Sequence, residues 1–205
     1  MSRAIFLGSF DPPHKGHRDV IESVVNSDVM RRCCIDKIHI IPTQQNPNKP
    51  KSTPFIDRYK MCLVMFGDIE NVLIDDIENQ VKPQYTFDLL KRFHCNEDEM
   101  IKSDFWWIIT AETIKELIHG EWYKGITMLC ENKFIVLVKD EEEIKYIKRE
   151  INWKEGQINF VKLNSTCNVH SSYIRQQYKE GNIETLDNTN EYVKDYIIRN
   201  KLYLK

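Results

Sequence analysis

The chain has 205 residues, which at roughly 150 residues per domain predicts one domain spanning 1–205. Its 29 basic and 31 acidic residues give a net charge of -2, so no bulk field attracts nucleic acid or an anionic membrane. The longest apolar runs, 61–66 and 105–109, are too short to span a bilayer, and the N-terminus lacks the long apolar region of a signal peptide. We therefore expect neither nucleic acid nor a membrane as a partner.

The cysteines form no C-x-x-C pair, and most lie inside apolar segments. We interpret them as free thiols that act as small buried hydrophobic side chains in a reducing compartment. A cytoplasmic location is expected, with the nucleus as the alternative. The six residues are Cys33, Cys34, Cys62, Cys95, Cys130 and Cys167.

Short apolar runs alternate with longer helical patterns along the chain. Strands are predicted at 3–8, 36–41, 72–75, 105–109, 133–139 and 157–162. Helices are predicted at 17–30, 55–66, 86–93, 141–150, 171–179 and 191–201, and the polar, proline-bearing segment 43–54 is predicted to be a loop. This alternation indicates an α/β fold with a Rossmann-like parallel sheet and helices on both faces. Ligands of such sheets bind outside the carboxyl ends of the strands.

The first loop, residues 8–17 with the sequence G-S-F-D-P-P-H-K-G-H, lies between the first predicted strand and the first predicted helix. Free N–H groups and the dipole at a helix start favour anions, and glycines allow close backbone approach. His14 and His17 are three residues apart, so both imidazoles can face the same anion. From residue types alone, two surface histidines or a zinc site are the alternatives, although the sequence offers no convincing third zinc ligand nearby.

A second segment, V-H-S-S-Y-I-R over residues 169–175, opens a predicted helix near the C-terminus. A serine at this helix start is expected either to cap the helix or to bind phosphate, and the two roles are compatible. Arg175 lies one turn inside the helix, where its fork of N–H donors can reach back to the same phosphate.

Both segments resemble signatures of the nucleotidylyltransferase superfamily, G-x-F-D-P-x-H-x-G-H and I-S-S-T-x-I-R. Between them the chain is similar to the nicotinate-mononucleotide adenylyltransferase branch, in a proline-bearing loop at 42–50, P-Q-Y-T at 83–86, I-I-T-A-E at 108–112 and the pair W-Y at 122–123. The resemblance runs nearly end to end. The chain departs from the branch at Thr110, Glu112 and His170, where the family has glycine, aspartate and serine.

The resemblance implies an enzyme that transfers AMP from ATP to nicotinate mononucleotide, giving deamido-NAD and pyrophosphate. A nicotinamide mononucleotide adenylyltransferase, or another adenylyltransferase of the superfamily, is the nearest alternative. A nucleotide-binding protein without turnover is the alternative from a different class, and the three departures are the features that permit it.

The resemblance also implies roles for individual residues. Catalysis is expected of His14, His17 and Arg175. Contacts to ATP are expected from Gly8, Ser9, Phe10, His14, Gly16, His17, Thr110, Glu112, Ser171, Ser172 and Arg175. Contacts to the mononucleotide are expected from Ser9, Phe10, Lys51, Tyr85, Thr86, Trp122 and Tyr123. Mg²⁺ is expected to arrive on the ATP phosphates, without a metal site on the protein, and the sequence leaves a homo-oligomer open.

Several of these residues also have a purely structural interpretation. Thr86 is either a ligand donor or an ordinary N-cap, and Trp122 either stacks on a pyridine ring or belongs to a satellite core. Trp106 and Trp107 are in a predicted buried strand, and at least one is expected in the core.

Overall fold

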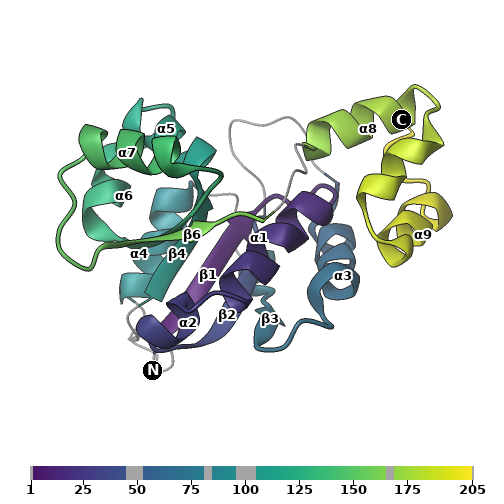
Figure 1. Ribbon diagram of the computed structural model, residues 1–205. Coiled ribbons are helices and arrows are strands. Elements are labelled where there is room, and N and C mark those ends of the chain that lie inside the picture. The colour runs from purple at the N-terminus through teal and green to yellow at the C-terminus, as the bar shows by residue number, and fades with distance from the viewer. Residues whose placement is uncertain (1, 45–52, 81–84, 96–104, 165–168, 205) are drawn as a thin grey trace. The chain divides into compact units, whose positions relative to one another are not determined.

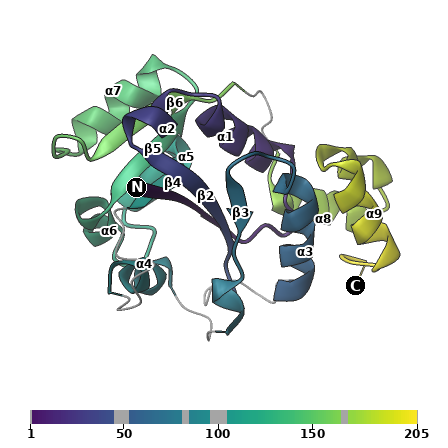
Figure 2. The same cartoon turned by 90° about the horizontal axis from the view of Figure 1, so that it is seen from below.

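A computed structural model describes residues 2–44, 53–80, 85–95, 105–164 and 169–204 (Figures 1 and 2). Its strands are β1 (Ser2–Gly8), β2 (Ile35–Pro42), β3 (Val72–Ile74), β4 (Phe105–Thr110), β5 (Lys133–Val138) and β6 (Ile158–Lys162). They form a sheet of order β3-β2-β1-β4-β5-β6, and the pairs β1–β4, β4–β5 and β5–β6 are parallel. The predicted α/β fold with a Rossmann-like parallel sheet is confirmed. The near-continuous burial of β4 and β5 is typical of strands covered on both faces.

The helices agree with the predicted pattern over most of the chain. They are α1 (Lys15–Val25), α2 (Val29–Arg32), α3 (Phe55–Phe66), α4 (Thr86–Cys95), α5 (Ala111–Ile118), α6 (Gly125–Glu131), α7 (Glu141–Glu150), α8 (Ser171–Lys179) and α9 (Glu191–Arg199), with short 3₁₀ turns η1 (Ile77–Gln80) and η2 (Ile183–Asn188). None of the helices in the described residues is long and apolar enough to cross a membrane.

The single helix predicted at 17–30 is wrong, because α1 and α2 are separate helices. The Ser27 hydroxyl donates to the Val24 carbonyl oxygen at 2.8 Å and accepts from the Val29 N–H at 3.3 Å. Such local side-chain bonds compete with the helical hydrogen-bond ladder. They end α1 and lead the chain into α2.

Contacts within the chain divide it into two compact units, each assembled from three segments. Unit 1 comprises Met1–Phe6, Ser23–His39 and Gln84–Asn164, and unit 2 comprises Leu7–Glu22, Ile40–Pro83 and Ser165–Lys205. The single nucleotidylyltransferase domain over 1–205 stays a prediction.

In unit 1, α5 packs against α6, α7 and the strands β4 and β5 (Figure 1). Trp107 lies 5.6 Å from Phe134 between ring centroids, and Phe134 lies 5.9 Å from Trp153. Trp106 and Trp107 are 7% and 2% exposed, so both lie in the core, where at least one was expected.

In unit 2, α3 packs against β3 and α9, and α8 packs against η2 (Figure 2). The α3 positions that face the interior include Phe55, Met61, Cys62 and Met65, at the spacing of one helix face. Arg58 lies on the same apolar face, where a charged side chain is unusual.

The cysteine prediction is confirmed in part. Cys33, Cys34, Cys62 and Cys130 are free thiols, and Cys62 is buried as expected. Burial is wrong for Cys34 and Cys130, which are exposed. The side chain of Cys95 and the whole of Cys167 lie outside the described residues.

Candidate active site

The first loop belongs to unit 2, between the end of β1 and the start of α1. Phe10 is 1% exposed and has a left-handed backbone with φ 48°. Its ring lies 5.0 Å from the His17 ring and 5.9 Å from the Phe66 ring, so it anchors the loop to α3. A Cβ on Gly8 would lie 2.9 Å from the Phe10 ring, so a larger residue at position 8 would clash with that ring.

The two histidines of the loop lie together. Their ring centroids are 3.7 Å apart, and the His14 backbone N–H donates to His17 Nδ1 at 3.2 Å. Because Nδ1 accepts, a neutral His17 carries its proton on Nε2, where it can donate to a ligand. The predicted proximity of His14 and His17 is confirmed.

Both imidazoles are held neutral at pH 7. Burial, and then the proximity of His170, lowers the pKa of His14 to about 4. Burial, His14 and His170 lower the pKa of His17 well below its ordinary value. His14 Nδ1 is buried without a hydrogen-bond partner among the described residues, and such an atom ordinarily costs about 1–3 kcal/mol. A ligand that offers this nitrogen a partner would remove that cost.

Helix α8 is tied to the first loop within the same unit. The Ser171 hydroxyl donates to the Pro12 carbonyl oxygen at 2.9 Å, and Arg175 Nη1 donates to the Asp11 carbonyl oxygen at 2.6 Å. The N-cap of α8 is His170, without a side-chain capping bond, so the expectation of a capping serine is wrong. Ser171 is already inside the helix and turns its hydroxyl to the loop, while Ser172 is exposed.

The remaining predicted residues that the structure describes lie in unit 1. The Tyr85 and Tyr123 rings are 4.6 Å apart, and Tyr123 is 49% exposed. Lys124 Nζ lies 5.2 Å from the Tyr123 ring and 4.5 Å from the Phe87 ring. Thr86 is the first residue of α4 and is half-buried.

Trp122 has the surroundings of a satellite core. Its indole N–H donates to Glu116 Oε2 at 2.7 Å, and its ring lies 6.4 Å from the Trp107 ring. Tyr123 is therefore the better placed of the two aromatics for stacking on a flat ligand.

The departures at Thr110 and Glu112 have a structural explanation. Thr110 is the N-cap of α5, and its hydroxyl oxygen accepts from the Thr113 N–H at 3.4 Å. Glu112 is exposed in the first turn of the same helix, where an acid favours the dipole. Lys51 lies outside the described residues.

Three further residues of unit 2 were not predicted as part of the site. Asp11 and Arg58 are buried, Tyr203 is half-buried, and all three form polar contacts around the first loop. Arg58 had a signal in the sequence, because it is a charged residue on the apolar face of α3. Tyr203 had none, because a tyrosine after the last helix has no periodic or motif context.

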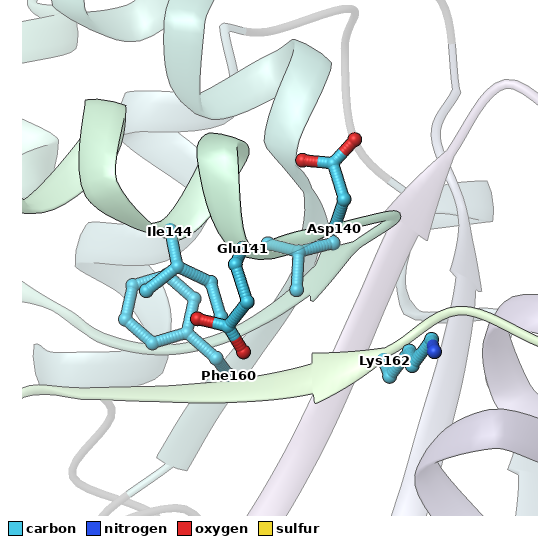
Figure 3. Close-up of a pocket in the computed structure, with 6 residues that line it drawn as sticks. Asp140, Glu141, Ile144, Phe160 and Lys162 are labelled. Carbon is cyan, nitrogen blue, oxygen red and sulfur yellow. The ribbon is translucent and has the colours of Figure 1, made fainter.

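A separate pocket of about 240 Å³ lies in unit 1 at the carboxyl ends of β5 and β6 (Figure 3). It is lined by Val138, Asp140, Glu141, Ile144, Phe160 and Lys162. Asp140 is the N-cap of α7, and its Oδ1 accepts from the Glu143 N–H at 3.0 Å. We assign this pocket no ligand.

Comparison with known proteins agrees with this fold. The cytidylyltransferase-like family model matches residues 5–177, so the chain belongs to this family of nucleotidylyltransferases. More narrowly, it belongs with the nicotinate-nucleotide adenylyltransferases. A Fusobacterium nucleatum protein named "Probable nicotinate-nucleotide adenylyltransferase" is 32% identical over 87% of this chain and 88% of its own length. A Clostridium botulinum (strain Kyoto) protein of the same name is 29% identical over 99% of each chain.

Solved structures support the fold. The Plasmodium falciparum nicotinic acid mononucleotide adenylyltransferase complexed with NaAD has a TM-score of 0.79, with 20% identity, 98% of this chain and 97% of that chain covered. The same Plasmodium enzyme complexed with APC has a TM-score of 0.75.

Proposed function

We propose that this chain transfers the adenylyl group of ATP to nicotinate mononucleotide. An oxygen of the mononucleotide 5′-phosphate attacks the α-phosphorus, the bond from that phosphorus to the bridging oxygen breaks, and pyrophosphate leaves. The products are deamido-NAD and pyrophosphate. Family membership and the paired histidines of the first loop support this proposal.

The work of the protein in this reaction is to place two polyanions and to stabilise the charge that develops on the phosphoryl oxygens. Neutral His14 and His17 would each donate one N–H to phosphate oxygens, next to the start of α1. Arg175 donates one arm of its guanidinium to the loop, so its other N–H groups would serve the phosphates. A phosphate dianion is itself a competent nucleophile, so no protein base is required.

Mg²⁺ fits this proposal as an ion held by ATP. Both oxygens of the carboxylate in the first loop already accept hydrogen bonds from the protein. Asp11 Oδ1 accepts from the Tyr203 hydroxyl, and Oδ2 accepts from the Thr53 N–H. Among the described residues, no group of three or more His, Cys, Asp or Glu is placed to hold a metal. When bound, the ion would neutralise the charge of the leaving pyrophosphate.

The proposal of nicotinate mononucleotide, and not the nicotinamide form, as the acceptor rests on residues of unit 1. An exposed Tyr123 ring can stack on a pyridine, and the ammonium of Lys124 beside it would attract a ring carboxylate. Within the described part of the chain, Lys124 has aromatic neighbours and no carboxylate partner. Thr86 adds a hydroxyl that can donate to the same carboxylate.

A cytoplasmic location is part of the proposal. Four free thiols among the described cysteines suit a reducing compartment.

The observation that carries the proposal is the close pair of buried His14 and half-buried His17, with the unpartnered Nδ1 of His14. His17→Ala should lower kcat by on the order of 10²–10³ with the fold intact, because one preorganised donor is lost. Pyrophosphate release and thermal unfolding measure the two effects, and His119→Ala, an exposed histidine in unit 1, is the matched control. Near wild-type turnover in the His17 variant would refute its role.

A further inference from the structure

A buried carboxylate in the first loop connects it to the segment that follows α9. Asp11 is 6% exposed. Its Oδ1 accepts from the Tyr203 hydroxyl at 2.8 Å, and its Oδ2 accepts from the Thr53 N–H at 3.2 Å. Burial, followed by the charge of Asp11, raises the pKa of Tyr203, so its hydroxyl stays protonated and donates.

A buried arginine holds the other side of the same loop. Arg58 is 1% exposed, and burial lowers its pKa while the charge of Asp11 opposes that effect. Its Nη1 donates to the carbonyl oxygens of Ser9 and Thr43, each at 2.7 Å. Its remaining bonds go to the carbonyl oxygens of Gln44 at 2.6 Å and Thr53 at 2.9 Å. One guanidinium therefore joins the first loop to the segments after β2 and before α3.

The segment that carries Tyr203 is itself fixed to α3. The Asn190 side chain donates to the Val64 carbonyl oxygen at 2.8 Å, and the Tyr196 hydroxyl donates to Asp57 Oδ1 at 2.7 Å. Helix α9 therefore keeps its place on α3 without the Tyr203 hydroxyl. Loss of that hydroxyl alone should disturb the loop more than it disturbs the fold.

We propose that Tyr203 is a positioning residue for adenylyl transfer, acting through Asp11 on the loop that carries His14 and His17. This inference rests on the proposed function. Asp11 is three residues before His14, and its backbone carbonyl oxygen accepts from Arg175. The Tyr203 hydroxyl and the Thr53 N–H are thus the two donors that hold the Asp11 carboxylate, and the Asp11 backbone is next to both the histidines and the arginine.

Tyr203→Phe removes the hydroxyl and keeps the ring. The buried Asp11 carboxylate then loses a donor and shifts to find another, and the loop shifts with it. Displacement of reacting groups by about 1 Å can cost a hundredfold in rate, so we expect kcat to fall by about tenfold to a hundredfold. The KM values for ATP and the mononucleotide should change by less than about threefold, because the binding groups are still present.

The test compares the full-length wild type, Tyr203→Phe and the control Tyr192→Phe, whose ring is 70% exposed. Each protein is assayed for kcat, both KM values, thermal unfolding and amide hydrogen exchange. We expect faster exchange over 9–14 in Tyr203→Phe, no change over α3, and wild-type behaviour of Tyr192→Phe.

Three results would overturn the inference. One is a kcat of Tyr203→Phe within about twofold of wild type. Another is a Tyr203→Phe variant that is partly unfolded at the assay temperature and regains both its fold and its kcat at a lower temperature. An equal loss in Tyr192→Phe would be the third. Wild-type protein that releases no pyrophosphate would instead refute the proposed function, and the inference with it.

Discussion

The imidazoles of His14 and His17 are the residues on which the proposed chemistry depends most. Burial lowers the pKa of both imidazoles. The proximity of His170 adds to this effect for His14, and the proximity of His14 and His170 adds to it for His17. A neutral imidazole still donates one N–H. The pair can therefore bind phosphate oxygens at pH 7 without carrying full positive charges.

The lowered pKa of His14 predicts an acid-sensitive fold. Its pKa is about 4 in the folded protein against 6.5 as the ordinary value, so the unfolded chain binds the proton more readily. The stability that neutral His14 contributes is present above pH 6.5 and is lost as the pH falls toward 4. Between about pH 7 and pH 5 the loss from this group should be about 2 kcal/mol.

Urea unfolding of the wild type and of His14→Asn at pH 7 and pH 5 measures the loss of unfolding free energy that His14 causes. The wild type should lose more unfolding free energy than the variant as the pH falls, with His119→Asn behaving like wild type. Equal losses in wild type and His14→Asn would contradict the assigned pKa.

At Arg175 we expect shape to matter as well as charge. Arg175→Lys keeps the cation and loses the fork that can hold the Asp11 carbonyl oxygen and a phosphate at once. Its kcat and ATP affinity should fall below wild type and stay above those of Arg175→Ala. Steady-state kinetics with varied ATP rank the wild type and the two variants. A lysine variant equal to wild type would show that only the point charge matters.

Much of the candidate site could be predicted residue by residue, because paired histidines and a helix start that follows a strand can be recognised in the sequence as anion-binding features. The first loop, Ser171 and Arg175 were predicted on that basis and lie in one unit. Asp11, Arg58 and Tyr203 act through contacts between segments that are far apart in the chain. No local pattern encodes such contacts, so they were missed.

At the scale of elements, periodicity predicted the strands and the longer helices but not the short ones. α3, α7 and α8 agree with prediction at both ends. α5 and α6 were missed, because a helix of seven or eight residues gives few repeats of the helical period. The capping Thr110 was the available signal for α5, and it was interpreted as a departure from a ligand motif.

The cap of α5 predicts a graded effect on stability. Thr110→Ala should cost about 1 kcal/mol, because the Thr113 N–H loses its acceptor. Thr110→Gly, the residue that the resembling family carries there, should cost only a few tenths of a kcal/mol. Chemical denaturation compares the two, and equal stabilities would contradict a capping role.

At the scale of the whole molecule, the parallel sheet followed from the alternation of strands and helices, whereas the division into two units did not. Each unit draws on three separate segments. β1 belongs to one unit up to Phe6 and to the other from Leu7, so no linker or change in composition marks the boundary. Composition can locate a boundary only where the chain crosses it once through an exposed segment.

The most direct test of the central claim is pyrophosphate release by the purified chain with ATP, Mg²⁺ and either nicotinate or nicotinamide mononucleotide. We predict turnover with nicotinate mononucleotide and a kcat/KM about fivefold or more lower with the amide, since a carboxamide lacks the negative charge that the Lys124 ammonium would attract. A preference for the amide would contradict the acceptor assigned here and leave adenylyl transfer in place. No pyrophosphate release with either acceptor would contradict the account as a whole.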